Sequence, residues 1–141
     1  MKFLAPLALS MSALVTPALA DIAIEDPYMR SASPNSPAGA AFMTIINEGE
    51  QPDRLIAAKA AFAKKVELHT HKLVDDVVQM VEVEGGFAIP AGTSYDLKRG
   101  GDHIMFMGLT EPVEDDAMLN VTLVFENAGE VEIEIPVDRS R

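Results

Sequence analysis

The chain has 141 residues with no Cys, and its 22 Asp and Glu against 11 Lys and Arg give a formal net charge of −11. Such an acidic surface repels nucleic acid and anionic lipid, so both are excluded as expected partners. Because Cys is absent, thiolate zinc sites, blue-copper sites, cysteine nucleophiles and disulfides are excluded as well.

The first element in chain order is a secretory signal peptide at residues 1–20. Lys2 precedes an apolar run, and the small residues Ala18 and Ala20 form an A-x-A-like cleavage site. The apolar run is too short, and too interrupted by proline, for a permanent transmembrane helix. We therefore expect export to the periplasm, signal cleavage and no membrane insertion afterwards. Residues 21–141, with a net charge of −12 once Lys2 is removed, have the size of one domain with one core.

The remaining sequence is a series of short β-like runs separated by turns rich in Gly, Pro, Asn and Asp. Segment 111–118 is read as a single helical turn, and no long segment has helical periodicity. This pattern predicts an all-β single domain, a β-sandwich with Greek-key connections. The candidate strands are 22–30, 40–48, 53–60, 64–71, 77–84, 93–98, a short strand within 100–109, 119–126 and 130–137.

In three candidate strands, His and Met residues lie on the face opposite the apolar residues. In the stretch HIMFM, Ile104 and Phe106 alternate with the His and Met residues, so each set faces one side of the strand. In the stretch VELHTH, Val66 and Leu68 likewise alternate with polar side chains. The soft-ligand set, always opposite the apolar residues, is His69, Met80, His103, Met105 and Met107.

Taken singly, each of these residues has an ordinary explanation. An outward Met is more often packed under a loop than bound to a metal, and a lone His is more often a hydrogen-bonded residue than a ligand. Together, thioether sulfur and neutral imidazole form the donor set that Cu(I) prefers, whereas zinc prefers thiolate, imidazole or carboxylate and hard cations prefer oxygen. Cu(II) held by His69, His71 and nearby carboxylates is an open alternative.

The residues resemble the PCu(A)C-type periplasmic copper chaperones, whose signature is His, ten residues, Met, about twenty-one residues and His-x-Met. Here His69 is followed after ten residues by Met80, and His103-Ile104-Met105 supplies the last part. The resemblance also covers the segments PYMRSASPNSPAGAAFMTIINEG and FENAGEVEIEIPV. Twenty-two residues separate Met80 from His103, and we expect the additional one in the turn EGGFAIPAG, where glycines absorb a change of length.

The resemblance implies a cupredoxin-like fold and one Cu(I) per chain, delivered by ligand exchange to respiratory cytochrome oxidase. The recipient would be an oxidase subunit at the CuA site or a copper assembly factor. It further implies a monomer and no enzymatic activity. The implied ligands are His69, Met80, His103 and Met105, with His71 and Met107 as additional ligands or supporting neighbours.

Three alternatives remain. A copper storage or resistance protein would use the same ligands. An exported interaction module would carry the His and Met residues by accident and would retain no copper. A small hydrolase would need a nucleophile beside His69 or His103, and the sequence has no nucleophile elbow.

Overall fold

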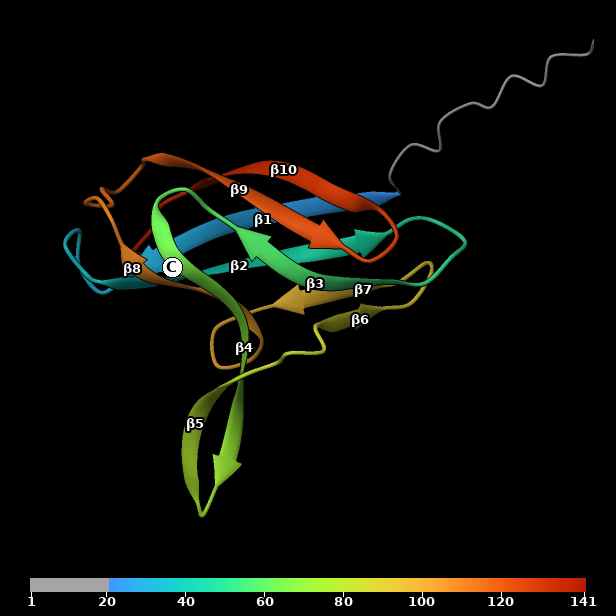
Figure 1. Ribbon diagram of the computed structural model, residues 1–141, viewed down its shortest axis with the longest axis horizontal. Coiled ribbons are helices and arrows are strands. Elements are labelled where there is room, and N and C mark those ends of the chain that lie inside the picture. The colour runs from blue at the N-terminus through green and yellow to red at the C-terminus, as the bar shows by residue number, and fades with distance from the viewer. Residues whose placement is uncertain (1–20) are drawn as a thin grey trace, which may run out of the picture.

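Ten strands in two antiparallel sheets form the described part of the chain, residues 21–141 of a computed structural model (Figure 1). The predicted signal peptide, 1–20, lies outside the described residues. The strands are β1 (Ile22–Ser31), β2 (Ala38–Asn47), β3 (Asp53–Lys59), β4 (Ala63–Val74), β5 (Val77–Glu82), β6 (Phe87–Ile89), β7 (Ser94–Leu97), β8 (His103–Leu109), β9 (Met118–Phe125) and β10 (Gly129–Pro136). The all-β sandwich predicted from the sequence is confirmed.

The larger sheet has the order β1-β2-β8-β4-β5, with β7 also paired to β2, and the smaller sheet has the order β10-β9-β3-β6. Strand β8 therefore lies between β2 and β4, although it comes much later in the chain. This crossing brings the two histidine-bearing segments next to each other. No helix long and apolar enough to span a membrane occurs within residues 21–141.

The core lies between the sheets and contains the apolar face of each strand. Ile104 and Phe106 of β8 are fully buried there, and Leu68 of β4 is only 4% exposed. The predicted orientation of these strands is confirmed, because a period of two sends alternate side chains to opposite faces. The other face of β8 carries His103, Met105 and Met107.

Two sequence expectations were wrong. Segment 111–118 contains no helical turn, because the N–H of Val113 donates to the carbonyl of Pro34 and Asp116 has a left-handed φ of 66°. The short strand β6 falls inside the segment read as a turn, between the two glycine signals. It is only three residues long, so its alternation was too brief to detect, yet Phe87 and Ile89 enter the core.

The hairpin of β4 and β5 projects from the body of the sandwich (Figure 1). Its turn consists of Asp75 and Asp76, both with positive φ, as in a two-residue type I′ hairpin. Leu73 and Val78 near its tip are each 64% exposed. The base of this hairpin carries the first predicted metal ligands.

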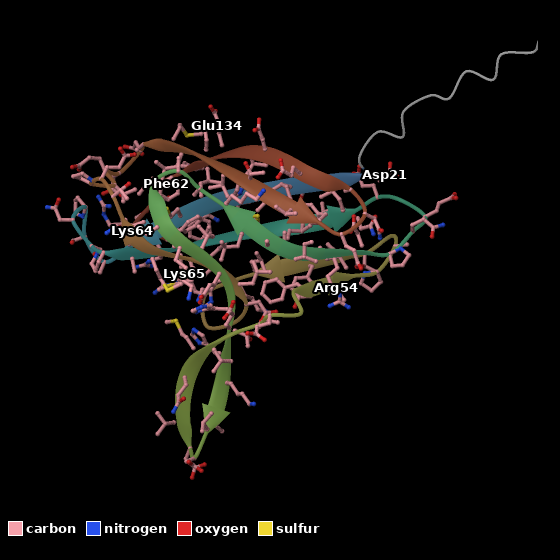
Figure 2. All side chains as sticks on the ribbon, viewed as in Figure 1. Asp21, Arg54, Phe62, Lys64, Lys65 and Glu134 are labelled. Carbon is pink, nitrogen blue, oxygen red and sulfur yellow. The ribbon has the colours of Figure 1, made fainter. Side chains whose placement is uncertain are left out.

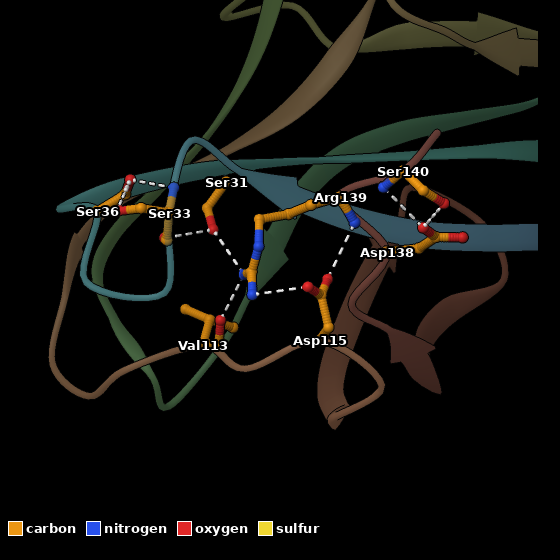
Figure 3. Close-up of polar contacts among 8 residues, drawn as sticks. All are labelled: Ser31, Ser33, Ser36, Val113, Asp115, Asp138, Arg139 and Ser140. Atoms are coloured by element: carbon orange, nitrogen blue, oxygen red, sulfur yellow. Dashed lines mark hydrogen bonds and ion pairs between the residues drawn. The ribbon is translucent and has the colours of Figure 1, made fainter.

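The C-terminal segment is tied to β1 through Arg139 (Figure 3). Its guanidinium donates to the carbonyl of Val113 at 2.7 Å and to the hydroxyl of Ser31 at 3.5 Å, and it pairs with the Asp115 carboxylate at 3.0 Å. The N–H of Asp138 also donates to the carbonyl of Met29. These contacts hold the last residues beside β1.

Asp53 at the start of β3 supports the turn between β9 and β10. Its carboxylate accepts the N–H groups of Asn127 and Ala128, both at 2.9 Å, and also that of Arg54. Replacing Asp53 with Ala should lower the free energy of unfolding by about 2–3 kcal/mol, because three partly buried N–H groups lose a charged acceptor. Urea unfolding will measure this difference, and an unchanged midpoint would contradict the role assigned to the carboxylate.

Candidate metal centre

The predicted ligands lie on three neighbouring strands, β4, β5 and β8. In the antiparallel register His69 stands opposite His103, and His71 stands opposite Met80. Met105 stands opposite Glu67, one pair further along. Directly opposed residues share a face of a sheet, so the structure brings the predicted set together.

His103 is almost fully buried, with 2% of its surface exposed. Its Nδ1–H donates to the carbonyl of Gly101 at 3.0 Å, which leaves Nε2 as the nitrogen with a free lone pair. Nε2 is buried without a hydrogen-bond partner. Burial, more than any other cause, lowers the pKa of the His103 imidazole below its usual value, so the ring is neutral at neutral pH.

His69 is held in a complementary way. Its Nε2–H donates to the Glu67 carboxylate at 2.7 Å, and its Nδ1 is buried without a partner. Glu67 also pairs with Lys65, and the hydrogen bond from His69, followed by that from Lys65, lowers the pKa of the carboxyl group. A carboxylate on one imidazole nitrogen orients the ring and makes the other nitrogen a better ligand.

The rings of His69 and His103 have centroids 5.7 Å apart and meet edge to face. Two buried nitrogens without partners, on adjacent strands, are costly in a fold unless something binds them. Within residues 21–141, no group of three or more His, Cys, Asp or Glu side chains is arranged to hold a metal ion. The Met80 and Met105 side chains beside His103 carry thioether sulfurs, which are donors of the kind that Cu(I) prefers.

A pocket of about 390 Å³ opens beside these residues. Met80 and Met105 line it together with His71 and His103. Met80 is 56% exposed, whereas His103 is buried, so the pocket connects the buried imidazole with the surface. His69 does not line the pocket, but it lies directly opposite His103 in the pairing of β4 with β8.

The two second-tier residues occupy different places. The ring of His71 lies 5.6 Å from that of His103, and it faces Met80 across the hairpin. Met107 pairs with Lys65 and Ala38, and it does not line the pocket. His71 is therefore well placed to join or replace His69, while Met107 covers the adjacent part of the sheet.

From the sequence, Glu67 and Asp102 could each orient a nearby imidazole ring, although a surface charge without a role is the more frequent case, and the structure shows a different contact for each. Glu67 orients His69, as described above. Asp102 accepts a hydrogen bond from the hydroxyl of Tyr95, not from an imidazole. Adjacency in sequence to a histidine was the only signal for these two carboxylates, and it does not say which way a side chain turns.

Tyr95 makes stability depend on alkaline pH. Burial, assisted by the hydrogen bond to Asp102, raises the pKa of Tyr95 from 10.0 to about 12. Its contribution is complete below pH 10 and is lost as pH rises to about 12, because the unfolded chain releases this proton first. In Tyr95→Phe, we expect a flatter decline of unfolding free energy over this range in urea titrations. A decline as steep as that of the wild type would contradict this assignment.

Comparison with known proteins places this geometry in a family. The family model described as "Putative lipoprotein LpqE-like" matches residues 22–137. "Putative lipoprotein Lxx21020" of Leifsonia xyli subsp. xyli is 35% identical over 98 residues, which are 70% of this chain and 59% of that protein. The chain thus spans about three fifths of the length of that relative.

Two solved structures with the same fold are of copper-bound proteins. The copper-bound PCuAC domain from PmoF2 aligns with a TM-score of 0.70 and 26% identity, over 86% of this chain and 96% of that domain. The solution structure of CuI-DR1885 from Deinococcus radiodurans aligns with a TM-score of 0.64 and 27% identity, over 82% and 76% of the two chains. The chain therefore belongs to the LpqE-like family and is a PCuAC-type domain, as the resemblance in its sequence predicts.

Proposed function

We propose that this protein is an exported copper chaperone that binds one Cu(I) per chain and is not an enzyme. It passes the ion by ligand exchange to respiratory cytochrome oxidase, at the CuA site or through a copper assembly factor. Its location is the periplasm. The proposed ligands are His69, Met80, His103 and Met105.

One observation carries this proposal. The buried nitrogens Nδ1 of His69 and Nε2 of His103 have no hydrogen-bond partner, and each ring is fixed by a hydrogen bond at its other nitrogen. Two imidazoles locked in this way offer lone pairs and no acidic proton. A +1 ion satisfies both nitrogens without requiring a charged ligand in the buried part of the site.

Delivery by exchange is supported by the exposure of Met80. A ligand on a projecting hairpin, more than half exposed, can leave the metal without unfolding the core. A storage site would be better served by ligands that are all buried. The relatives described as copper-bound and as putative lipoproteins support copper binding and export, respectively.

The binding experiment is a titration of residues 21–141 with Cu(I) in competition with a chromophoric chelator. The wild type should remove one equivalent of Cu(I) from the chelator. The His103→Ala/Met105→Ala variant should leave the amount of the Cu(I)–chelator complex unchanged. Circular dichroism of the metal-free variant checks that the fold survives. If both proteins compete equally weakly with the chelator for Cu(I), the copper proposal is wrong and an interaction module is favoured.

Delivery needs a second experiment. The Cu(I)-loaded protein is mixed with a copper-free CuA domain, and the appearance of copper in the acceptor is followed by its absorption after oxidation. Transfer within minutes supports the chaperone role. Tight binding without transfer to this acceptor or to an assembly factor would support storage instead.

A further inference from the structure

We propose that Tyr95 is a positioning residue for the copper site, because its hydroxyl holds the loop whose carbonyl fixes the His103 imidazole. This inference rests on the proposed copper function and deepens it. Tyr95 does not line the pocket, and it acts through the main chain of the loop. Its role is to keep the proton of His103 on the nitrogen that faces away from the metal.

The loop 98–102 leaves the large sheet between β7 and β8. Strand β7 pairs with residues 43–46 of β2 and β8 pairs with residues 38–41, while β1 covers the other edge of β2. The loop is therefore an excursion from a single edge. It lies beside the base of the β4–β5 hairpin, where sulfur atoms gather (Figure 2). Two of its residues, Arg99 and Gly100, line the pocket of the proposed copper site.

The direction of one peptide in this loop controls the His103 ring. The N–H of Lys98 donates to the carbonyl of Asp102, and the N–H of Gly101 donates to the carbonyl of Lys98, both at 3.0 Å. The Gly101 carbonyl is thereby turned to accept from Nδ1–H of His103. A neutral imidazole carries its proton on only one nitrogen. Rotation of this peptide would release Nδ1, and the proton could then move to Nε2, the nitrogen proposed to bind copper.

The Tyr95 hydroxyl restrains that peptide from the core side of the sheet. It donates to the carboxylate of Asp102, the residue directly before His103. Tyr95 pairs with the fully buried Ile45, so its ring faces the core, where it stacks on Phe87 with centroids 5.5 Å apart. The chain before His103 is therefore tied to a fixed ring on one face, while the imidazole enters the copper pocket on the other.

The loop needs this restraint because of its composition. Gly100 and Gly101 are adjacent, and Gly100 has a left-handed φ of 81°. Glycine has more backbone freedom than any other residue, so two in succession allow the following peptide to rotate at small cost. A side-chain hydrogen bond at Asp102, immediately after the two glycines, restricts that rotation where the imidazole depends on it.

Tyr95→Phe tests the role, because it keeps the ring on Phe87 and removes only the hydroxyl. Mutating the direct hydrogen-bond partner of a metal ligand lowers affinity by about ten- to a hundredfold, and Tyr95 acts one contact further away. We therefore expect Cu(I) affinity to fall about fivefold in competition with a chromophoric chelator. The control is Tyr28→Phe, which removes the hydroxyl of the second tyrosine, whose ring packs on Phe42. It should keep wild-type affinity, and an equal loss in both variants would overturn the proposal.

A double-mutant cycle separates positioning from a general loss of stability. Asp102→Ala should weaken Cu(I) binding as much as Tyr95→Phe, and the combined variant should lose no more, because both changes remove the same hydrogen bond. Asp102→Asn retains an acceptor for the hydroxyl and should restore most of the affinity lost in Asp102→Ala. Losses that add up in the combined variant would show that the two side chains act independently, against the proposal.

A metal-free measurement makes failure of this inference distinguishable from failure of the copper function. At about pH 8, where histidine is neutral, the imidazole nitrogen chemical shifts of His103 should show a protonated Nδ1 and an unprotonated Nε2 in wild type and Tyr28→Phe. In Tyr95→Phe the two shifts should move toward each other, as the tautomer with the proton on Nε2 becomes populated. Unchanged shifts in Tyr95→Phe would remove Tyr95 from its positioning role, whether or not the protein binds copper.

Discussion

Replacing His103 with Ala should weaken Cu(I) binding by about a hundredfold or more. Mutating only the hydrogen-bond partner of a metal ligand already lowers metal affinity by about ten- to a hundredfold, and loss of the ligand itself should cost at least as much. His103 is the most buried of the proposed ligands, and its ring is fixed by Gly101 with Nε2 left free. The measurement is the dissociation constant in competition with a chromophoric chelator. A variant that keeps wild-type affinity would remove His103 from the site.

The same assay distinguishes His69 from His71. His69 has the buried nitrogen without a partner, whereas His71 lines the pocket and faces Met80. His69→Ala should therefore resemble His103→Ala, while His71→Ala should lose less than about tenfold in affinity. The reverse order would identify His71 as the ligand and give His69 a supporting role.

Replacing Phe106 with Ala should reduce the free energy of unfolding by about 3–5 kcal/mol, the usual cost of removing a buried aromatic ring. Phe106 is fully buried, and its ring centroid lies 5.1 Å from that of Phe62. Urea unfolding monitored by circular dichroism gives the difference. The effect would identify the core face of β8, whose opposite face carries the metal ligands.

Val78→Ala is the control for this experiment, because Val78 is 64% exposed near the hairpin tip. Its unfolding free energy should change by less than about 0.5 kcal/mol, as for most surface substitutions. A loss in Val78→Ala as large as that in Phe106→Ala would mean that the hairpin, and not β8, contributes the larger share of the core.

Local sequence information was sufficient for the fold class and for the orientation of single strands. Alternation in HIMFM placed Ile104 and Phe106 in the core and His103 on the other face, because β periodicity depends only on the chain itself. The His and Met residues on one face likewise indicated a soft ion such as Cu(I), with Cu(II) left open, because ligand softness depends on residue type. The short strand β6 and the loop at 111–118 were predicted wrongly, since both depend on contacts with distant segments.

Only the tertiary structure decided which groups act together. The opposition of His69 and His103 requires β4 and β8 to pair in one register, and no local pattern specifies a pairing between strands so far apart in the chain. The hydrogen bond between Tyr95 and Asp102, and the approach of Arg30 and Arg99 to the same oxygen of Arg141, likewise depend on the folded structure. Residue types and their spacing thus indicated the kind of metal ion, whereas the tertiary structure determined which imidazole nitrogens have no hydrogen-bond partner.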